Sequence, residues 1–162
     1  MADMLVNLYE LPSEGTLLTD LSKQGIEIIR ALSLDKHIIT NFIKKYFDGG
    51  DSWASECEAA FTHTPISCFI AVCKKKIIGF GCYESTAKDY FGPTGVSKQY
   101  RKKGIGKALL LKCLYAMKEE GYGYAIIGWP ADDAIHFYEN SVGATLIKSK
   151  NNGVYERMIN SD

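Results

Sequence analysis

Hydrophobic and polar positions along the first half of the chain repeat with two different periods, which predict strands alternating with helices. Residues 25–32 (GIEIIRAL) form a short, isoleucine-rich run, and we expect a first strand there. Apolar side chains then recur at three- and four-residue spacing over residues 38–46, which predicts a helix that Asp35 can cap. A second helix is expected after the DGGD break, with Ser52 as its cap and an end near Thr62.

The middle of the chain predicts a hairpin followed by an irregular strand. Residues 67–84 contain two apolar, β-prone runs joined by three lysines, which is the pattern of an antiparallel hairpin with residues 74–76 at its tip. Residues 90–98 (YFGPTGVSK) predict another strand, interrupted by two glycines and a proline. Isolated glycines in a strand often mark a bulge, so we expect the strand to be distorted there.

The last third of the chain predicts a long helix, a buried strand, a short helix and a hairpin. The helix is indicated by an apolar stripe over residues 105–117, and the strand by YAIIGW at residues 124–129. The short helix is expected over residues 132–140, and the hairpin over residues 144–159, turning at Asn152 and Gly153. The predicted order of elements is therefore β-α-α-β-β-β-α-β-α-β-β.

Length and composition favour one soluble domain. A chain of 162 residues can bury a substantial core once but would be cramped as two domains. The sequence has no internal repeat and no long linker, so we expect an N-terminal extension at residues 1–24 and one domain at residues 25–162. Neither a signal peptide nor a run of about 20 apolar residues is present, which favours a cytoplasmic protein.

Charge and cysteine content limit the partners that we expect. Nineteen basic and nineteen acidic side chains balance, which argues against nucleic acid or an anionic membrane as a partner. The five cysteines are odd in number and include no CxxC pair, so we expect buried thiols in a reducing compartment and no metal.

The segment RKKGIGKA, at residues 101–108, has the features of a phosphate-binding loop. It lies between a predicted strand and a predicted helix, where unpaired amides of the first helical turn converge. The helix dipole and four cationic side chains add to the attraction for a pyrophosphate. A P-loop is excluded because Arg101 and Ala108 stand where Gly and Ser or Thr are needed, and Leu109 breaks the dinucleotide-binding GxGxxG pattern.

Two motifs in order give the chain a family resemblance. Residues 101–106 fit the signature R/Q-x-x-G-x-G/A, and Ala134, Phe137 and Tyr138 fit a following A-x-x-F-Y motif. Over residues 25–162 the chain resembles the GNAT superfamily of acetyl-CoA-dependent N-acetyltransferases. The resemblance implies a GNAT-like α/β single domain, with a mixed, mostly antiparallel central sheet, helices on both faces, and central strands splayed to admit acetyl-CoA.

The resemblance also implies where acetyl-CoA would bind and how its acetyl group would be transferred. Tyr138 would be the general acid that protonates the leaving thiolate, although such a tyrosine can also be part of the core. The expected mechanism is direct transfer to a primary amine, without a covalent acetyl-enzyme. The expected cofactor-binding residues are Thr94, Val96, Arg101, Lys102, Lys103, Gly104, Ile105, Gly106 and Lys107.

Two departures from the family pattern affect the second motif. Ala131 stands where the family often has an asparagine, so one contact to the cofactor is expected to be missing. Gly143 follows Tyr138 by five residues where four are usual, which leaves the direction of the Tyr138 hydroxyl open.

A general base and the amine acceptor are harder to assign from sequence. Glu84 is the candidate base, because a carboxylate at a strand end can relay a proton through water, but it could equally be a solvated turn residue. Glu56 and Glu58 are expected on the second predicted helix, which in the family commonly lines the acceptor pocket, although such glutamates more often mark the wet face of a helix. Trp53 and Tyr90 are the candidate aromatic contacts of an acceptor.

Three alternatives remain open at this point. The acceptor could be a small-molecule or a peptide amine, and a homodimer is neither favoured nor excluded. The transferred group could be an acyl group other than acetyl. The chain could also be a CoA-binding sensor or interaction module without turnover.

Overall fold

A seven-stranded sheet with the strand order β2-β3-β4-β5-β6-β1-β7 forms the centre of the molecule in a computed structural model, which describes residues 2–161. The β5–β6 pair is parallel and the other pairs are antiparallel, so the expected mixed, mostly antiparallel sheet is confirmed. The strands are β1 Asp3–Asn7, β2 Ile26–Arg30, β3 Cys68–Cys73, β4 Lys76–Tyr83, β5 Tyr90–Val96, β6 Tyr124–Ile127 and β7 Thr145–Ile147.

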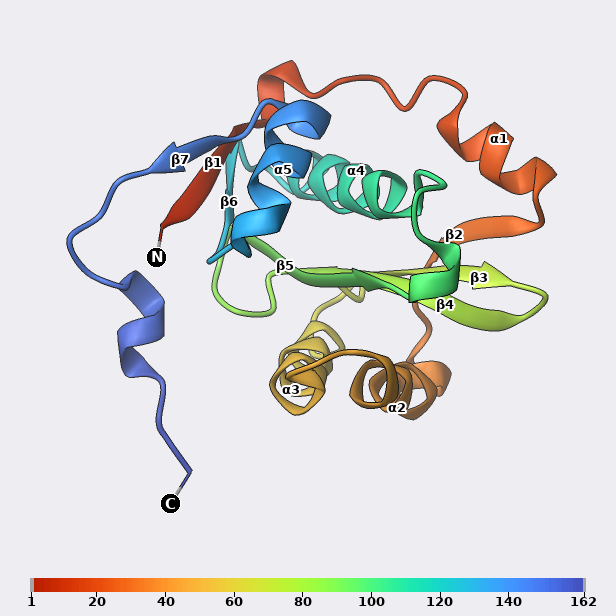
Figure 1. Ribbon diagram of the computed structural model, residues 1–162, viewed down its shortest axis with the longest axis horizontal. Coiled ribbons are helices and arrows are strands. Elements are labelled where there is room, and N and C mark those ends of the chain that lie inside the picture. Colours follow the sequence, from red (N-terminus) through yellow and green to blue (C-terminus); the bar gives the residue numbers. More distant parts are fainter. Residues whose placement is uncertain (1, 162) are drawn as a thin grey trace.

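Helices cover both faces of this sheet (Figure 1). α1, α4 and α5 lie on one face, and α2 and α3 lie on the other. The helices are α1 Leu17–Lys23, α2 Lys36–Tyr46, α3 Gly50–Ala60, α4 Ile105–Glu119 and α5 Ile135–Val142. Two separate apolar cores result, because the sheet divides Leu109 and Leu114 of α4 from Ile39 and Ile43 of α2.

The first strand differs from the sequence-based expectation. We expected residues 1–24 to be an extension outside the domain, but β1 lies inside the sheet, with Met4 opposite Ile127 of β6 on one side and Leu146 of β7 on the other. Met4 and Val6 are fully buried while their neighbours are only partly so, which is the alternation of a strand that has one face in the core.

The expected C-terminal hairpin is wrong for a related reason. Residues 144–159 form only β7 and then a short 3₁₀ helix, Gly153–Arg157, so the chain does not turn back at Asn152. β7 pairs with β1 instead, and a partner from the other end of the chain takes the place of a local one.

The hairpin at residues 67–84 and the two helices before it match the expectation closely. Lys74 and Lys75 form the tight turn between β3 and β4 with φ values of 51° and 62°. α3 starts before the expected cap Ser52, because Gly49 turns the chain with φ of 70°. A Cβ at Gly50 would lie 2.7 Å from the carbonyl oxygen of Ile43, so only glycine lets α3 approach the end of α2 this closely.

Candidate functional site

The sheet opens between β5 and β6. These two strands pair only at Tyr90 with Ile126 and at Phe91 with Ile127, after which β6 ends while β5 continues to Val96. β5 is also irregular against β4, since its register shifts between Phe91 and Thr94. The expected distortion of this strand is therefore confirmed, and β5 has a free edge in the middle of the molecule.

Two backbone amides of β5 point to this free edge. The N–H of Ser97 donates to the carbonyl oxygen of Ile78 at 2.9 Å, on the β4 side. Successive residues of a strand direct their N–H groups to opposite sides, so those of Thr94 and Val96 face the opening. The Thr94 hydroxyl points away from the opening and donates a hydrogen bond to the carbonyl oxygen of Phe80 at 2.9 Å. The contact that we expected from Thr94 to the cofactor can thus be made by its backbone N–H.

The loop after β5 leads directly to the amino end of α4. Gly104 is the N-cap of α4, with φ of 89°. The N–H of Ala108 donates a hydrogen bond to the carbonyl oxygen of Gly104 at 3.0 Å. The amides of Ile105, Gly106 and Lys107 come before this first helical bond, so they are available to an anion. A further αL residue, Lys102, has φ of 66° and shapes the loop as a concave set of N–H groups.

Gly106 brings this helix end close to both β5 and α5. A Cβ at Gly106 would lie 3.7 Å from Phe137 Cζ and 3.9 Å from Val96 Cγ2. The three elements therefore approach one another at Gly106. Phe137 is 37% exposed at this border.

The cationic side chains of the loop are available for an anionic ligand. Within residues 2–161 the ion pairs are Lys112 with Glu14 and His136 with Glu139, so the loop cations are not neutralised by an acidic neighbour. The Arg101 Nε donates to the carbonyl oxygen of Val96 at 3.1 Å, which ties the loop to β5. The expected cofactor-binding residues run from Thr94 and Val96 of β5, through the loop, to the first turn of α4.

A cavity of about 910 Å³ continues from the free edge of β5. Its walls come from six parts of the chain: α3, the turn after β4, β5, the end of β6 with the segment after it, the start of α5 with the residue before it, and the C-terminal 3₁₀ segment. The lining residues include Trp53, Glu56, Thr86, Phe91, Pro93, Thr94, Trp129, Ala134, Tyr138 and Tyr155. Five of the lining residues are aromatic, which suits a ligand with an apolar part.

Tyr138 lies where the cavity meets the free edge. Its side chain is 7% exposed and packs edge-on against Phe91, with ring centroids 6.2 Å apart. Burial raises the pKa of Tyr138 to about 12, so the hydroxyl stays protonated at neutral pH and can donate a proton. The late Gly143 does not displace it, since Gly143 ends α5 with φ of 67° and its N–H donates to the carbonyl of Glu139.

Glu84 is not where a general base would be needed. It follows the end of β4 with φ of 60°, and its carboxylate accepts a hydrogen bond from the N–H of Asp89 at 2.6 Å. Its carbonyl oxygen contacts His63 Nε2 at 3.0 Å. Glu84 therefore closes the turn between β4 and β5 and is not part of the cavity wall. These contacts favour the alternative for Glu84, a turn residue, over a general base.

Glu56 occupies the cavity wall instead. It is half-buried on α3, and the hydroxyl of Thr86 donates a hydrogen bond to its carboxylate. Burial raises the pKa of Glu56, and the bond from Thr86 opposes this only in part. The sequence left two positions open for Glu56, the pocket wall and the wet face of the helix, and the structure has it in the pocket wall. Its position three residues after Trp53, which also lines the cavity, was the signal that could have identified it.

Two aromatic residues of the cavity had no sequence signal. Trp129 and Tyr155 stack with ring centroids 4.2 Å apart and an interplanar angle of 25°. Tyr155 comes from the C-terminal 3₁₀ helix, which we expected to be half of a hairpin. Tyr90, the other expected acceptor contact, is not part of the cavity wall, and its hydroxyl donates to Asp3 at 3.2 Å.

Solved structures share this fold at low sequence identity. A GCN5-related glucosamine N-acetyltransferase region of a fungal multi-domain GH3 β-N-acetylglucosaminidase matches with a TM-score of 0.71 and 13% identity, over 90% of this chain and 19% of that chain. A GCN5-related N-acetyltransferase from Sphaerobacter thermophilus matches with a TM-score of 0.67 and 19% identity, over 90% of this chain and 48% of that chain. The chain thus spans about a fifth and about half of these two proteins.

A further solved structure was determined with a ligand. It is a GNAT family acetyltransferase from Brucella melitensis in complex with acetyl-CoA, with a TM-score of 0.51 and 14% identity, over 69% of this chain and 80% of that chain. Comparison with curated protein sequences gives no match. Among the described residues, no helix combines the length and the apolar character needed to cross a membrane.

The family itself is shown by a match along the sequence. Residues 33–144, which are more than half of the chain, match the model of the acetyltransferase (GNAT) family. This region contains β5, the loop before α4, and Tyr138, and so the site built above. The chain belongs to the acetyltransferase (GNAT) family.

Proposed function

We propose that this protein transfers the acetyl group of acetyl-CoA directly to a primary amine. What supports the proposal is the path along the chain from the amino end of α4 back to the free edge of β5, where Thr94 lines the same cavity as Tyr138. One end of this path suits a phosphate group and the other suits an apolar acceptor, as a two-substrate transfer requires.

The residues along the path fit acetyl-CoA. The free amides of Ile105, Gly106 and Lys107 would hold the pyrophosphate, and Arg101, Lys102 and Lys103 would add positive charge around it. The amides of Thr94 and Val96 would bind the pantetheine arm and polarise the thioester carbonyl. Bound acetyl-CoA would supply the acetyl group as an activated thioester.

Two side chains of the cavity would manage protons. Tyr138, protonated at neutral pH, would donate to the sulfur that leaves. An alkylamine with an ordinary pKa near 10 must lose a proton before it can attack, so an acceptor of that proton is needed. Glu56 would take this role in place of Glu84, because its carboxylate lies on the cavity wall and burial raises its pKa.

The proposal is tested by the release of free thiol from acetyl-CoA in the presence of a panel of primary amines. We expect release that depends on an amine and an acetylated product found by mass spectrometry. Propionyl-CoA and longer acyl-CoA thioesters, tried with the best amine, test the acyl group. If CoA raises the melting temperature but no amine supports release, the chain is a CoA-binding module and the proposal fails.

A further inference from the structure

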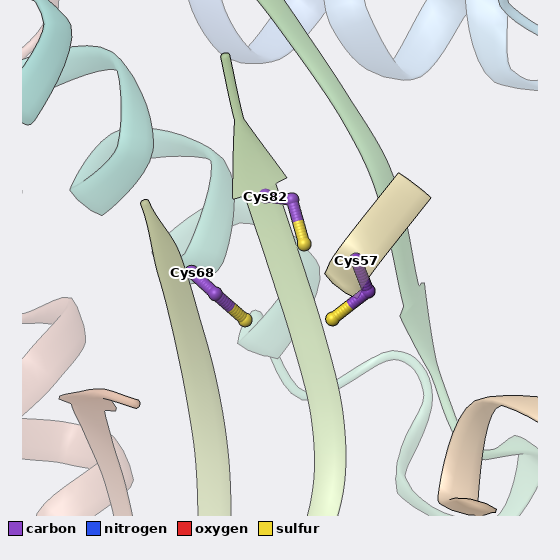
Figure 2. A group of neighbouring side chains, drawn as sticks. All are labelled: Cys57, Cys68 and Cys82. Atoms are coloured by element: carbon purple, nitrogen blue, oxygen red, sulfur yellow. The ribbon is translucent and has the colours of Figure 1, made fainter. Parts of the chain in front are cut away.

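Three thiols converge in the core on the α2–α3 side of the sheet, away from the cavity. Cys57 belongs to α3, Cys68 to β3 and Cys82 to β4. Figure 2 shows the three sulfur atoms pointing toward one another from these three elements. The sulfurs all lie within 4.8 Å of one another, and Cys68 and Cys82 are directly opposite in the β3–β4 pair.

The distances are close to those of a metal site. An ion at the centre of three sulfurs 4.8 Å apart lies about 2.8 Å from each, while a bond from thiolate sulfur to a first-row metal is about 2.3 Å. Side-chain movements of about half an ångström would close this difference. The three ligands are therefore already collected, and a metal would not have to assemble them.

The surroundings select the kind of ion. All three cysteines are fully buried, in an apolar cluster that includes Ile70 and Phe80. Among the described residues no histidine or carboxylate joins the group. Thiolate ligands favour soft ions such as Cu(I) and Zn(II), but structural Zn(II) takes four ligands and only three are present. Cu(I) accepts two or three sulfur ligands, so it suits the group as it stands.

Charge is compatible with the same ion. Adding net charge to an apolar core costs free energy unless it is paired. A monovalent Cu⁺ that displaces one thiol proton leaves the charge of the cluster unchanged, because one H⁺ leaves for each Cu⁺ that binds. A divalent ion must displace two protons to do the same. No electron is transferred in this exchange.

We propose that Cys57, Cys68 and Cys82 form a buried binding site for one Cu(I) ion. The ion would link α3 to β3 and β4, which pack against one another here in one apolar cluster. Since Cys57 follows Glu56 in α3, a bound ion would also fix the helix that forms one wall of the cavity. The inference does not depend on the proposed transferase activity.

The test is a Cu(I) titration of the reduced protein under anaerobic conditions, with bicinchoninate as a competing chromophoric chelator. We expect one Cu(I) per chain and a melting temperature that rises with Cu(I). Replacement of one ligand, in Cys57→Ser or Cys82→Ser, should weaken Cu(I) binding at least tenfold. Cys113→Ser and Cys73→Ser change thiols outside the group and are the matched controls.

Two results would overturn the proposal. One is Cu(I) binding that is as tight in Cys57→Ser as in the unchanged protein. The other is a loss of Cu(I) affinity in Cys113→Ser as large as the loss in Cys57→Ser, which would indicate adventitious binding by thiols. If the serine variants do not fold, X-ray absorption on the unchanged protein decides, because a first shell of sulfur alone supports the site and one containing nitrogen or oxygen refutes it.

Discussion

The carboxylate of Asp3 accepts a hydrogen bond from the backbone N–H of Trp129 at 3.0 Å, although the two residues are 126 positions apart. The other carboxylate oxygen accepts from the Tyr90 hydroxyl at 3.2 Å. Trp129 has φ of 41°, a conformation that bulky side chains rarely adopt. The first residue of β1 therefore helps to hold the cavity wall after β6 in place.

Asp3→Ala should lower the free energy of unfolding by about 1–3 kcal/mol, because it leaves the Trp129 N–H and the Tyr90 hydroxyl without this acceptor. Urea denaturation measures the change. Glu58→Ala removes an exposed carboxylate from α3 and should stay within about 0.5 kcal/mol of the unchanged protein. If the two substitutions changed the free energy of unfolding equally, the hydrogen bonds of Asp3 would not contribute to stability.

CoA and acetyl-CoA should raise the melting temperature, and NAD and ATP should do so far less, because the loop lacks the spacing of their motifs. Gly106→Val should weaken CoA binding at least tenfold, since side-chain atoms at this position enter the space in front of the free amides. A Cβ there meets Phe137 and Val96 only at 3.7 and 3.9 Å, so the fold should survive. The affinity for CoA measures the effect on binding, and the melting temperature without ligand measures the effect on folding. Unchanged affinity would mean that the loop is only a turn and does not bind CoA.

Tyr138→Phe removes one hydroxyl and keeps the ring against Phe91. Loss of a general acid typically costs about 10²- to 10⁴-fold, so kcat should fall at least tenfold while KM for acetyl-CoA stays nearly constant. The raised pKa of about 12 implies that Tyr138 causes no decline of kcat below about pH 10. Pre-steady-state kinetics must show that chemistry limits the rate; normal turnover in that case would remove Tyr138 from the mechanism.

Glu56→Gln should lower kcat/KM and yet stabilise the protein at neutral pH. Burial raises the pKa of Glu56 above its ordinary 4.5, so folding favours the protonated form. This contribution to stability is complete below pH 4.5 and is lost as the pH rises through the higher folded-state pKa. A neutral glutamine avoids that loss and can still accept the bond from Thr86.

The pH profile of activity gives an independent check on Glu56. A base with a raised pKa must be deprotonated, so kcat/KM should fall on the acid side with an apparent pKa above 4.5, and Glu56→Gln should abolish that acid limb. Glu84→Gln is the matched control, because Glu84 is outside the cavity wall. If Glu84→Gln removes the acid limb and Glu56→Gln does not, the earlier assignment of the base was right.

Elements whose contacts are local were predictable from the sequence. The β3–β4 hairpin, the α4 stripe and the loop before α4 each depend on residues within about 20 positions, so periodicity and turn chemistry were enough. Pairing across the whole chain has no such signal. β1 was missed because five residues with the alternation of an ordinary strand do not say which distant strand they will join.

The parts of the candidate site that depend on local sequence were predictable in the same way, and those that depend on distant segments were not. The free amides near Gly104 and the position of Tyr138 follow from two short motifs. The sequence did not show that Glu84 closes a turn, because its φ of 60° leaves no signal in the pattern of residue types. Tyr155 reaches the cavity only because the C-terminal segment crosses to α3, a tertiary arrangement that the local sequence does not encode.

The interior position of β1 has a consequence for synthesis on the ribosome. β1 is made well before its partners β6 and β7, which end at Ile127 and Ile147, so this part of the sheet cannot close until the chain through β7 has emerged. Met4 and Val6, fully buried at the end, stay without partners during that time. Chains truncated before β6 should therefore expose an apolar strand and aggregate, whereas the completed protein covers it from both sides.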